Sequence, residues 1–228
     1  MKEDDYYSDR KNKPEQPFRR TGPLDAYIYK EWSNDGNVEN TKNEVMVHLP
    51  RPVQIQPQPQ ETNSLHIFTD GACTNNGRRN ASAAWGVLVL GSDHRIIEED
   101  SGKIPPREMQ TNQRAELRAL LRGFEIAESY INRSQNPMTD VQIWSDSQYS
   151  IKCTSEWGLT WRKNGWTKKG GDIQHLDIIK PLVQSYTQNF GKIRLKWVEG
   201  HKGGAQQHQF PWMFNHRVDV IATAALQG

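Results

Sequence analysis

Cysteine is scarce in this chain of 228 residues, and its two cysteines, Cys73 and Cys153, form no CxxC or other metal-ligand spacing. A disulfide-rich scaffold and a cysteine-based zinc ribbon are therefore excluded. Long hydrophobic runs are also missing, because no stretch approaches the ~18 apolar residues that a transmembrane helix needs. The chain further lacks a glycine-rich phosphate loop and the nucleophile elbow of serine hydrolases, so these two enzyme classes are not indicated.

Targeting signals are absent as well. The chain shows no signal peptide, and its first residues, Met-Lys-Glu-Asp-Asp-Tyr-Tyr, are too acidic for a typical mitochondrial transit peptide. We therefore expect an intracellular protein, cytoplasmic or nuclear, that is not secreted and does not contact a membrane.

Apolar residues are few for a globular chain, at 35% with a mean hydropathy of −0.86. Residues 1–63 account for much of this, because they are polar and proline-rich and end in a Pro/Gln alternation over 50–60. Such a sequence favours extended polyproline II and disorder over packed structure. The sequence predicts a disordered or loosely docked N-terminal extension and linker at 1–63, followed by one catalytic domain at 64–228. One aromatic stretch, 24–32, is predicted to pack as a surface arm in preference to binding a partner.

Charge of one sign does not dominate the whole chain, but the two parts differ. Up to Glu61 there are 9 Lys/Arg and 11 Asp/Glu, whereas the remainder holds 20 and 16, a net charge of +4. A mildly basic domain suits a polyanionic ligand.

Apolar periodicity from about residue 64 onward predicts an α/β fold. Alternating or β-branched runs predict strands, and apolar residues three and four apart predict helices. The expected strands are 65–72, 84–91, 95–104, 141–145 and 192–199; the expected helices are 111–130, 148–161, 173–186 and 214–226. The first three strands are expected to pair as antiparallel hairpins, and the fourth to pair parallel to the first after a long helix. The result is a mixed five-stranded sheet flanked by helices.

Four carboxylates stand in this framework where hard oxygen ligands would be useful. Asp70 and Asp146 follow apolar strands, and Glu116 and Asp219 lie in early turns of helices. Carboxylates of this kind bind Mg²⁺, and open α/β sheets place their sites at the carboxyl ends of strands. Any one of these four residues, taken alone, is more simply explained as a helix cap, a turn residue or a solvated charge than as a metal ligand. Together they predict a site in which two cations activate water and stabilise a leaving oxygen during phosphodiester hydrolysis.

Six short motifs resemble cellular type 1 ribonuclease H, in order from about Leu65 to Leu226. They are Thr69-Asp-Gly-Ala, Thr111-Asn-Gln-Arg-Ala-Glu-Leu-Arg-Ala-Leu, Ser145-Asp-Ser-Gln-Tyr, Trp161-Arg-Lys-Asn-Gly-Trp, Val198-Glu-Gly-His and Asn215-His-Arg-Val-Asp. The resemblance implies a ribonuclease H-like fold and a metal-dependent endonuclease. The implied reaction is hydrolysis of the RNA strand of RNA–DNA hybrids to 5′-phosphate and 3′-hydroxyl ends. It also implies two Mg²⁺ ions, which Mn²⁺ can replace. We expect a monomer whose protein partners the sequence does not reveal.

The same resemblance assigns roles to individual residues. The metal ligands are Asp70, Glu116, Asp146 and Asp219, with Gly71 included in the metal site, and His201 takes the position of a mobile histidine that assists proton transfer or product release. Substrate contacts fall on two groups of residues. The first group, expected to contact the RNA strand and read its 2′-hydroxyls, contains Asn76, Asn112 and Gln113. The second, a basic aromatic segment for the DNA strand, contains Trp157, Trp161, Lys163, Trp166, Lys168 and Lys169. The structural alternatives are turn capping for Asn76, helix entry for Asn112 and packing for the tryptophans.

The chain departs from the family pattern at three places. About eight additional residues, including the apolar run 210–214, separate His201 from Asp219. Relatives bind a DNA phosphate in a pocket that contains a threonine, an arginine and an asparagine. Here Thr111 is retained, but Met109 replaces the arginine and Gln174 replaces the asparagine. Arg107 is the cation that could substitute for the missing arginine. The N-terminal region shows no small aromatic hybrid-binding domain.

Three alternatives remain open from the sequence. A zinc site at His201, His208 and His216 is disfavoured, since these residues lack cysteine partners and helical i,i+4 spacing. The chain resembles the ribonuclease H portion of a reverse transcriptase too, although no polymerase sequence precedes it. A catalytically impaired module that only binds hybrids or duplexes is the main alternative to an enzyme. Such a module would have no use for four carboxylates, which repel phosphate unless a cation neutralises them.

Overall fold

The computed structural model describes residues 64–133, 140–200 and 204–227. The predictions for the extension at 1–63 and for His201 lie outside the described residues. The described elements, in chain order, are β1 (Ser64–Thr74), β2 (Ser82–Leu90), β3 (Ile96–Lys103), α1 (Asn112–Arg133), β4 (Asp140–Ser145), α2 (Gln148–Ser155), α3 (Trp157–Lys163), α4 (Leu176–Gln188), β5 (Ile193–Trp197), the 3-10 helix η2 (Gly204–His208) and α5 (Trp212–Ala225).

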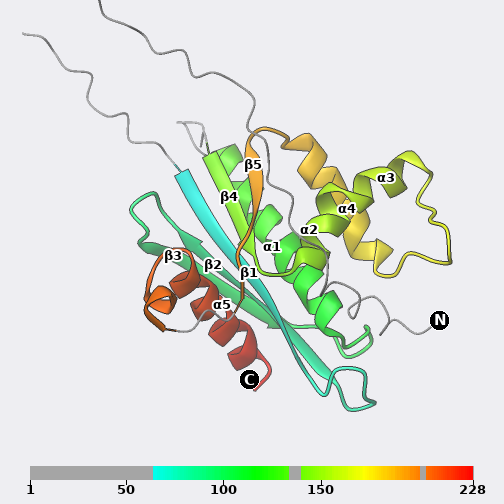
Figure 1. Cartoon of the computed structure of the whole chain (residues 1–228), viewed down its shortest axis with the longest axis horizontal. Coiled ribbons are helices and arrows are strands. Elements are labelled where there is room, and N and C mark those ends of the chain that lie inside the picture. Colours follow the sequence, from blue (N-terminus) through cyan, green and yellow to red (C-terminus); the bar gives the residue numbers. More distant parts are fainter. Residues whose placement is uncertain (1–63, 134–139, 201–203, 228) are drawn as a thin grey trace, which may run out of the picture. The chain divides into compact units, whose positions relative to one another are not determined.

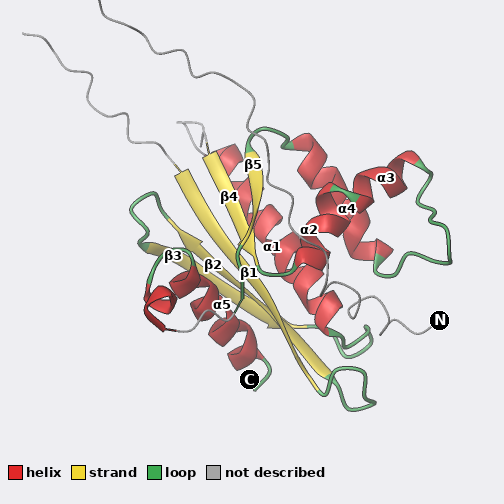
Figure 2. Cartoon of the chain, in the orientation of Figure 1, coloured by secondary structure: helices red, strands yellow, loops and turns green. Residues whose placement is uncertain are grey.

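The five strands form one mixed sheet in the order β3-β2-β1-β4-β5. β1 pairs antiparallel with β2, and β2 with β3, whereas β1 pairs parallel with β4, and β4 with β5. The predicted α/β fold and the mixed pairing are therefore confirmed. Figure 1 and Figure 2 show α5 over one face of the sheet and α1, with α2 and α4 beside it, over the other.

Side chains alternate between the two faces of the central strands, as the pleat requires. Ile67 of β1 and Val87 of β2 point to the α1 side, whereas Phe68 and Leu88, one residue further on, point to the α5 side. All four are fully buried, because helices cover both faces at this point. Because both faces are covered, consecutive residues of the central strands are apolar and do not alternate with polar ones.

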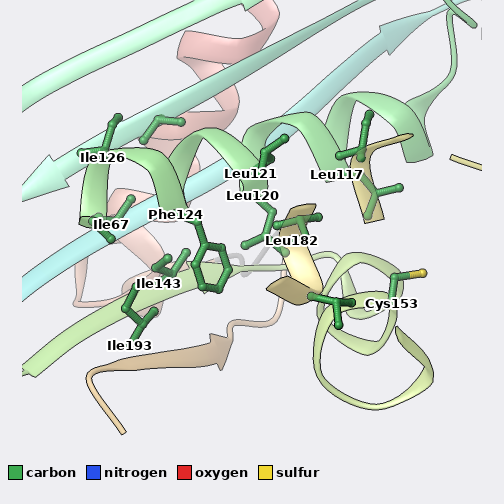
Figure 3. Close-up of a cluster of buried hydrophobic side chains, with 14 of the residues drawn as sticks. Ile67, Leu117, Leu120, Leu121, Phe124, Ile126, Ile143, Cys153, Leu182 and Ile193 are labelled. Atoms are coloured by element: carbon green, nitrogen blue, oxygen red, sulfur yellow. The ribbon is translucent and has the colours of Figure 1, made fainter. Parts of the chain in front are cut away.

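The larger core lies between the sheet and the helices α1, α2 and α4. The apolar stripe of α1, with Leu117, Leu120 and Phe124, packs on Ile143 of β4 and on residues of α4 such as Leu182 (Figure 3). These side chains recur at i, i+3 and i+7 along α1, which is the period that places them on one helix face. Burial of this stripe fixes α1 across β1 and so fixes the residues that α1 carries.

The smaller core lies between the sheet and α5, and it contains part of the inserted apolar run. Phe210 stacks on His94 with ring centroids 4.3 Å apart and meets Phe68 edge-on at 5.9 Å. Phe214, in the first turn of α5, is buried in the same cluster. The insertion therefore anchors the start of α5 on the sheet through an aromatic cluster.

Two predicted helices differ from the structure. The helix expected over 148–161 is two helices, α2 and α3, which meet at Glu156; its φ of −112° and ψ of −68° stay in the right-handed region but depart from ideal helical values. The helix expected from 173 begins at Leu176, because His175 has a left-handed φ of 59°. Neither break is marked by proline or glycine at the break itself, and therefore periodicity alone did not reveal it. Of the helices that the structure describes, none is both long and apolar enough to cross a membrane.

Candidate active site

Three carboxylates from distant parts of the chain meet at one point. Asp70 of β1, Glu116 of α1 and Asp146, which directly follows β4, offer ligand oxygens that all lie within 4.8 Å of one another. Asp70 and Glu116 are buried, at 6% and 7% exposure, and Asp146 is half-buried. Carboxylates this close repel one another when ionised, and burial removes the water that would screen them.

The backbone brings these three residues together. β1 and β4 are parallel neighbours, so Asp70 and Asp146, each beyond the last paired residues Phe68 and Trp144, emerge at the same end of the sheet. α1 then crosses β1 at Gly71, where a β-carbon would lie only 2.3 Å from the backbone nitrogen of Glu116. Only glycine permits this contact between helix and strand, and the contact sets Glu116 beside Asp70.

The fourth carboxylate, Asp219, reaches the same strand from the opposite face. α5 lies against β2 at Gly86, where a β-carbon would lie 2.8 Å from the backbone nitrogen of Ala222. Gly86 is the register partner of Asp70 across the β1–β2 pair. Asp219 is accordingly close enough to Asp70 for its charge to raise the pKa of that carboxyl group, although Asp219 does not belong to the tight group of three. The structure thus places all four predicted acidic residues around β1.

Burial raises the pKa of Asp70 well above its ordinary value, and the charges of Asp146 and Asp219 raise it further. Burial is also the main cause that raises the pKa of Glu116, followed by the charges of Asp70 and Asp146. The backbone N–H of Gly71 donates to both carboxylates and opposes these shifts. The site is therefore costly to ionise in the absence of a cation.

A divalent cation fits this site. The Oε2 atom of Glu116 is buried and has no hydrogen-bond partner among the described residues, so it is an acceptor without a donor. Hard carboxylate oxygens are the ligands that Mg²⁺ and Mn²⁺ prefer. A cation bound there would satisfy Oε2 and remove the repulsion among the three carboxylates.

These pKa directions predict how the metal-free protein responds to pH. Because the folded state raises the pKa of Asp70 and Glu116, it holds their protons more tightly than the unfolded chain, whose carboxyl groups titrate near about pH 4. Their contribution to stability is full below about pH 4 and is lost as pH rises through the raised folded-state pKa values. As pH rises above about 4, we expect the Tm of wild type in chelator to fall relative to that of Glu116→Gln, and Mg²⁺ to reverse the fall. Parallel Tm profiles of the two proteins would contradict this.

The comparisons with known proteins agree with this geometry. Residues 62–227 match the family model described as RNase H. The chain belongs to the ribonuclease H family. Ribonuclease H of Thiobacillus denitrificans is 33% identical over 159 residues, 69% of this chain and 90% of the relative. Ribonuclease H of Erythrobacter litoralis is 31% identical over 162 residues, 71% of this chain and 94% of the relative. The chain is accordingly an enzyme, a metal-dependent endoribonuclease.

Solved structures of ribonuclease H share the fold. LC9-RNase H1, a type 1 RNase H with the type 2 active-site motif, is 25% identical with a TM-score of 0.55, covering 73% of this chain and 74% of that one. The RNase H domain of PFV gives a TM-score of 0.59 at 17% identity, covering 73% and 96% of the two chains. The mixed five-stranded sheet is thus that of the ribonuclease H fold.

The residues expected to read RNA lie together at the start of α1. The side-chain Oδ1 of Asn76 accepts a hydrogen bond from the backbone N–H of Asn112, at 3.2 Å and 36 positions along the chain. Thr111 Oγ1 accepts from the N–H of Arg114 and so caps the helix. Helix entry, the structural alternative for Asn112, is therefore observed, whereas Asn76 accepts from the first residue of α1 and does not cap its own turn. Gln113 is exposed.

Sequence reasoning missed Gln110, which holds this segment in place. Its Nε2 group lies within hydrogen-bonding distance of the carbonyl oxygens of Ile104, Pro105 and Glu108, and its Oε1 accepts from the N–H of Ala83 in β2. The loop that leads into α1 is thereby tied to the sheet. A glutamine in a loop carries no sequence signal for this role, which depends on backbone groups from two separate segments.

The residues predicted for a DNA-phosphate pocket lie at the surface, beside a buried ion-pair network that the sequence did not reveal. Met109 is exposed, as are Arg107 and Gln174. Arg114 is buried instead, with ion pairs of 2.5 Å to both Glu108 and Asp177. His175 lies beside Arg114, at 3.5 Å between Nδ1 and Nη1, and burial lowers its pKa, an effect that the Arg114 charge reinforces. This ion-pair network joins the N-termini of α1 and α4.

In the basic aromatic segment, the tryptophans are partly buried and the lysines are exposed. Trp157, Trp161 and Trp166 are partly buried against the larger core, with Lys180 5.5 Å from the centre of the Trp166 ring. The three lysines are exposed to solvent; they are Lys163, Lys168 and Lys169. The tryptophans therefore form the support of this surface, and the lysines are the groups available to an anionic ligand.

Proposed function

We propose that this chain hydrolyses the RNA strand of RNA–DNA hybrids with two divalent cations, leaving 5′-phosphate and 3′-hydroxyl ends. The observation that carries the proposal is the close approach of Asp70, Glu116 and Asp146, with a buried Glu116 oxygen that lacks a partner among the described residues. Membership of the ribonuclease H family supports the same reaction.

Each group of the site has a task in this proposal. Asp70, Glu116, Asp146 and Asp219 would hold Mg²⁺, or Mn²⁺ in its place, with the backbone of Gly71 beside them. When bound, the cations lower the pKa of the attacking water and stabilise the leaving 3′ oxygen. The carboxylates would hold the cations beside β1, just beyond the end of its pairing with β4, where the scissile phosphate would approach. His201 is proposed to assist proton transfer or product release.

Recognition of the hybrid is proposed to divide between two surfaces. Asn76, Asn112 and Gln113, at the start of α1, would contact the 2′-hydroxyls of the RNA strand, which both donate and accept hydrogen bonds. The exposed lysines of the basic aromatic segment would contact phosphates of the DNA strand. Side-chain amides would thus bind the RNA strand and lysine side chains the DNA strand. The protein should therefore bind a hybrid more tightly than double-stranded RNA or double-stranded DNA.

A direct assay tests the function. The protein is incubated with a labelled RNA–DNA hybrid, a matching double-stranded RNA and a single-stranded RNA, each with Mg²⁺ and with chelator. We expect cleavage of the hybrid alone, dependent on Mg²⁺, with products that a 5′-phosphate-dependent exonuclease can degrade. Tight binding of the hybrid without cleavage under Mg²⁺ or Mn²⁺ would support the alternative of a binding module.

Gln113 offers a separate test of RNA recognition. Its side chain is exposed, so Gln113→Ala should not change Tm. Loss of one hydrogen bond to the RNA strand, worth about 1–1.5 kcal/mol, should lower kcat/KM on the hybrid about tenfold, mainly through KM. Gln227→Ala is a matched control, because Gln227 is also an exposed glutamine but lies beyond the end of α5. Equal kcat/KM for the two variants would count against the proposed contact.

A further inference from the structure

Asn215 contacts a carboxylate of the acidic site without being one of its expected ligands. Its Nδ2 group donates a hydrogen bond of 3.3 Å to Oδ2 of Asp146. Asn215 lies on α5 one helical turn before Asp219, so both side chains are on the face of α5 that meets the sheet. It is 5% exposed, which is unusual for an asparagine.

The carbonyl oxygen of the Asn215 amide makes no hydrogen bond within the described part of the chain that would compensate for its burial. The Oδ1 atom of Asn215 is buried and has no hydrogen-bond partner among the described residues. An unpaired buried acceptor destabilises the fold, and a leucine, whose side chain branches at the same carbon, would avoid that destabilisation. Packing therefore does not explain an amide at this place. The bond to Asp146 is the contact that only an amide supplies.

Asp146 is less buried than Asp70 and Glu116, and contacts from two elements fix its position. Its backbone is fixed, since its carbonyl oxygen accepts from Nε1 of Trp197 at 3.1 Å. On one side of its carboxylate lies Gly200, where a β-carbon would approach Oδ2 to 2.7 Å. Asn215 lies at the same oxygen. The carboxylate is thus confined between α5 and the loop that follows β5.

We propose that Asn215 is a positioning residue that holds the Asp146 carboxylate in the orientation that binds a divalent cation. The hydrogen bond engages Oδ2 and restricts rotation of the carboxylate, and its remaining lone pairs would be available to bind a cation. It also places a partial positive charge beside Asp146, which lowers the cost of assembling three carboxylates before the cation arrives. The proposal deepens the proposed function and rests on its metal site.

Mg²⁺ binding without nucleic acid tests this proposal. The rise of Tm with Mg²⁺ concentration is measured for wild type, Asn215→Leu, Asn215→Ala and the control His216→Ala, which alters an exposed neighbour on α5. We expect Asn215→Leu to fold with at least the wild-type Tm in chelator, because it removes the unpaired Oδ1. It should nevertheless need about tenfold more Mg²⁺ for the same rise, as a lost hydrogen bond to a charged group predicts. His216→Ala should match wild type.

The outcomes separate a positioning role from a structural one. A folded Asn215→Leu protein with the wild-type Mg²⁺ response would overturn the proposal, even if Asn215→Ala is unstable. In cleavage assays, the concentration of Mg²⁺ at half-maximal rate should rise about tenfold for Asn215→Leu, with KM for the hybrid unchanged. If wild type binds Mg²⁺ but cleaves no hybrid, the proposed function fails while the inference about Asn215 stands.

Discussion

Asp70→Asn is expected to abolish hydrolysis of the hybrid while making the metal-free protein more stable. Asp70 lies at the centre of the site, with ligand oxygens of Glu116 and Asp146 within 4.8 Å and the Asp219 charge near enough to raise its pKa. Loss of one ligand removes several kcal/mol of the stabilisation that the cations give to the transition state, which corresponds to a fall in kcat of at least about 10³-fold. The same change removes a buried charge from a repelling group, so Tm in chelator should rise.

The two effects must appear together for the interpretation to hold. Single-turnover cleavage of a labelled hybrid measures the first, and thermal unfolding in chelator near neutral pH measures the second. Asp93→Asn is a suitable control, because Asp93 lies in the exposed turn between β2 and β3 and pairs with Arg95. A variant that keeps more than about one hundredth of wild-type activity would show that Asp70 is not a metal ligand.

Gly71→Ala is expected to damage both the fold and the site. A β-carbon at this position would lie 2.3 Å from the backbone nitrogen of Glu116 and 2.6 Å from the carbonyl carbon of Ala115. Backbone atoms of a helix cannot yield as a side chain does, so α1 must move away from β1. Overpacking of this kind costs about 3 kcal/mol, or a fall in Tm of roughly 10 °C for a domain of this size. A displaced Glu116 should lower kcat more than about a hundredfold.

The measurement is activity at a temperature well below the reduced Tm, so that the loss is not caused by unfolding. Gly91→Ala provides the comparison, because a β-carbon there meets only flexible side-chain atoms of Asp93 and Ile97, at 3.1 and 3.6 Å. Near-wild-type Tm and activity in Gly71→Ala would mean that α1 does not rest on β1 as described.

The sequence predicted the fold, and it named the three carboxylates that the structure brings together, because both depend on local patterns. Asp70 and Asp146 lie at the ends of apolar runs that form neighbouring strands, and Glu116 lies in the first turns of a helix with a clear apolar stripe. Asp219 had the weakest support from sequence, since an insertion separates it from His201. The structure accounts for its position through Phe210 and Phe214, which pack in the smaller core and anchor α5.

What the sequence did not reveal depends on contacts across long separations. Arg114 meets Asp177 63 positions away, and Asn215 meets Asp146 69 positions away. Arg114, Asp146 and Asn215 each lie within one of the six short motifs, but no motif or period reveals which residue each contacts, because the contact depends on how two distant segments lie relative to one another. His175 was missed in favour of Gln174 for a similar reason. Its left-handed backbone turns it inward to Arg114 while its neighbour faces solvent.

The parallel pairing of β1 with β4 also has a consequence for how the enzyme folds. Thr69 bonds to the carbonyl of Trp144 across 75 positions, and the chain between them must close into a loop before Asp70 and Asp146 can meet. Contacts of such long range form late and slowly in folding. A compact intermediate in which α1 has formed but β4 has not yet paired with β1 would have Asp70 and Glu116 in place but not Asp146. Recovery of Mg²⁺ binding during refolding should therefore lag behind recovery of helical signal, and it would report when the centre of the sheet is complete.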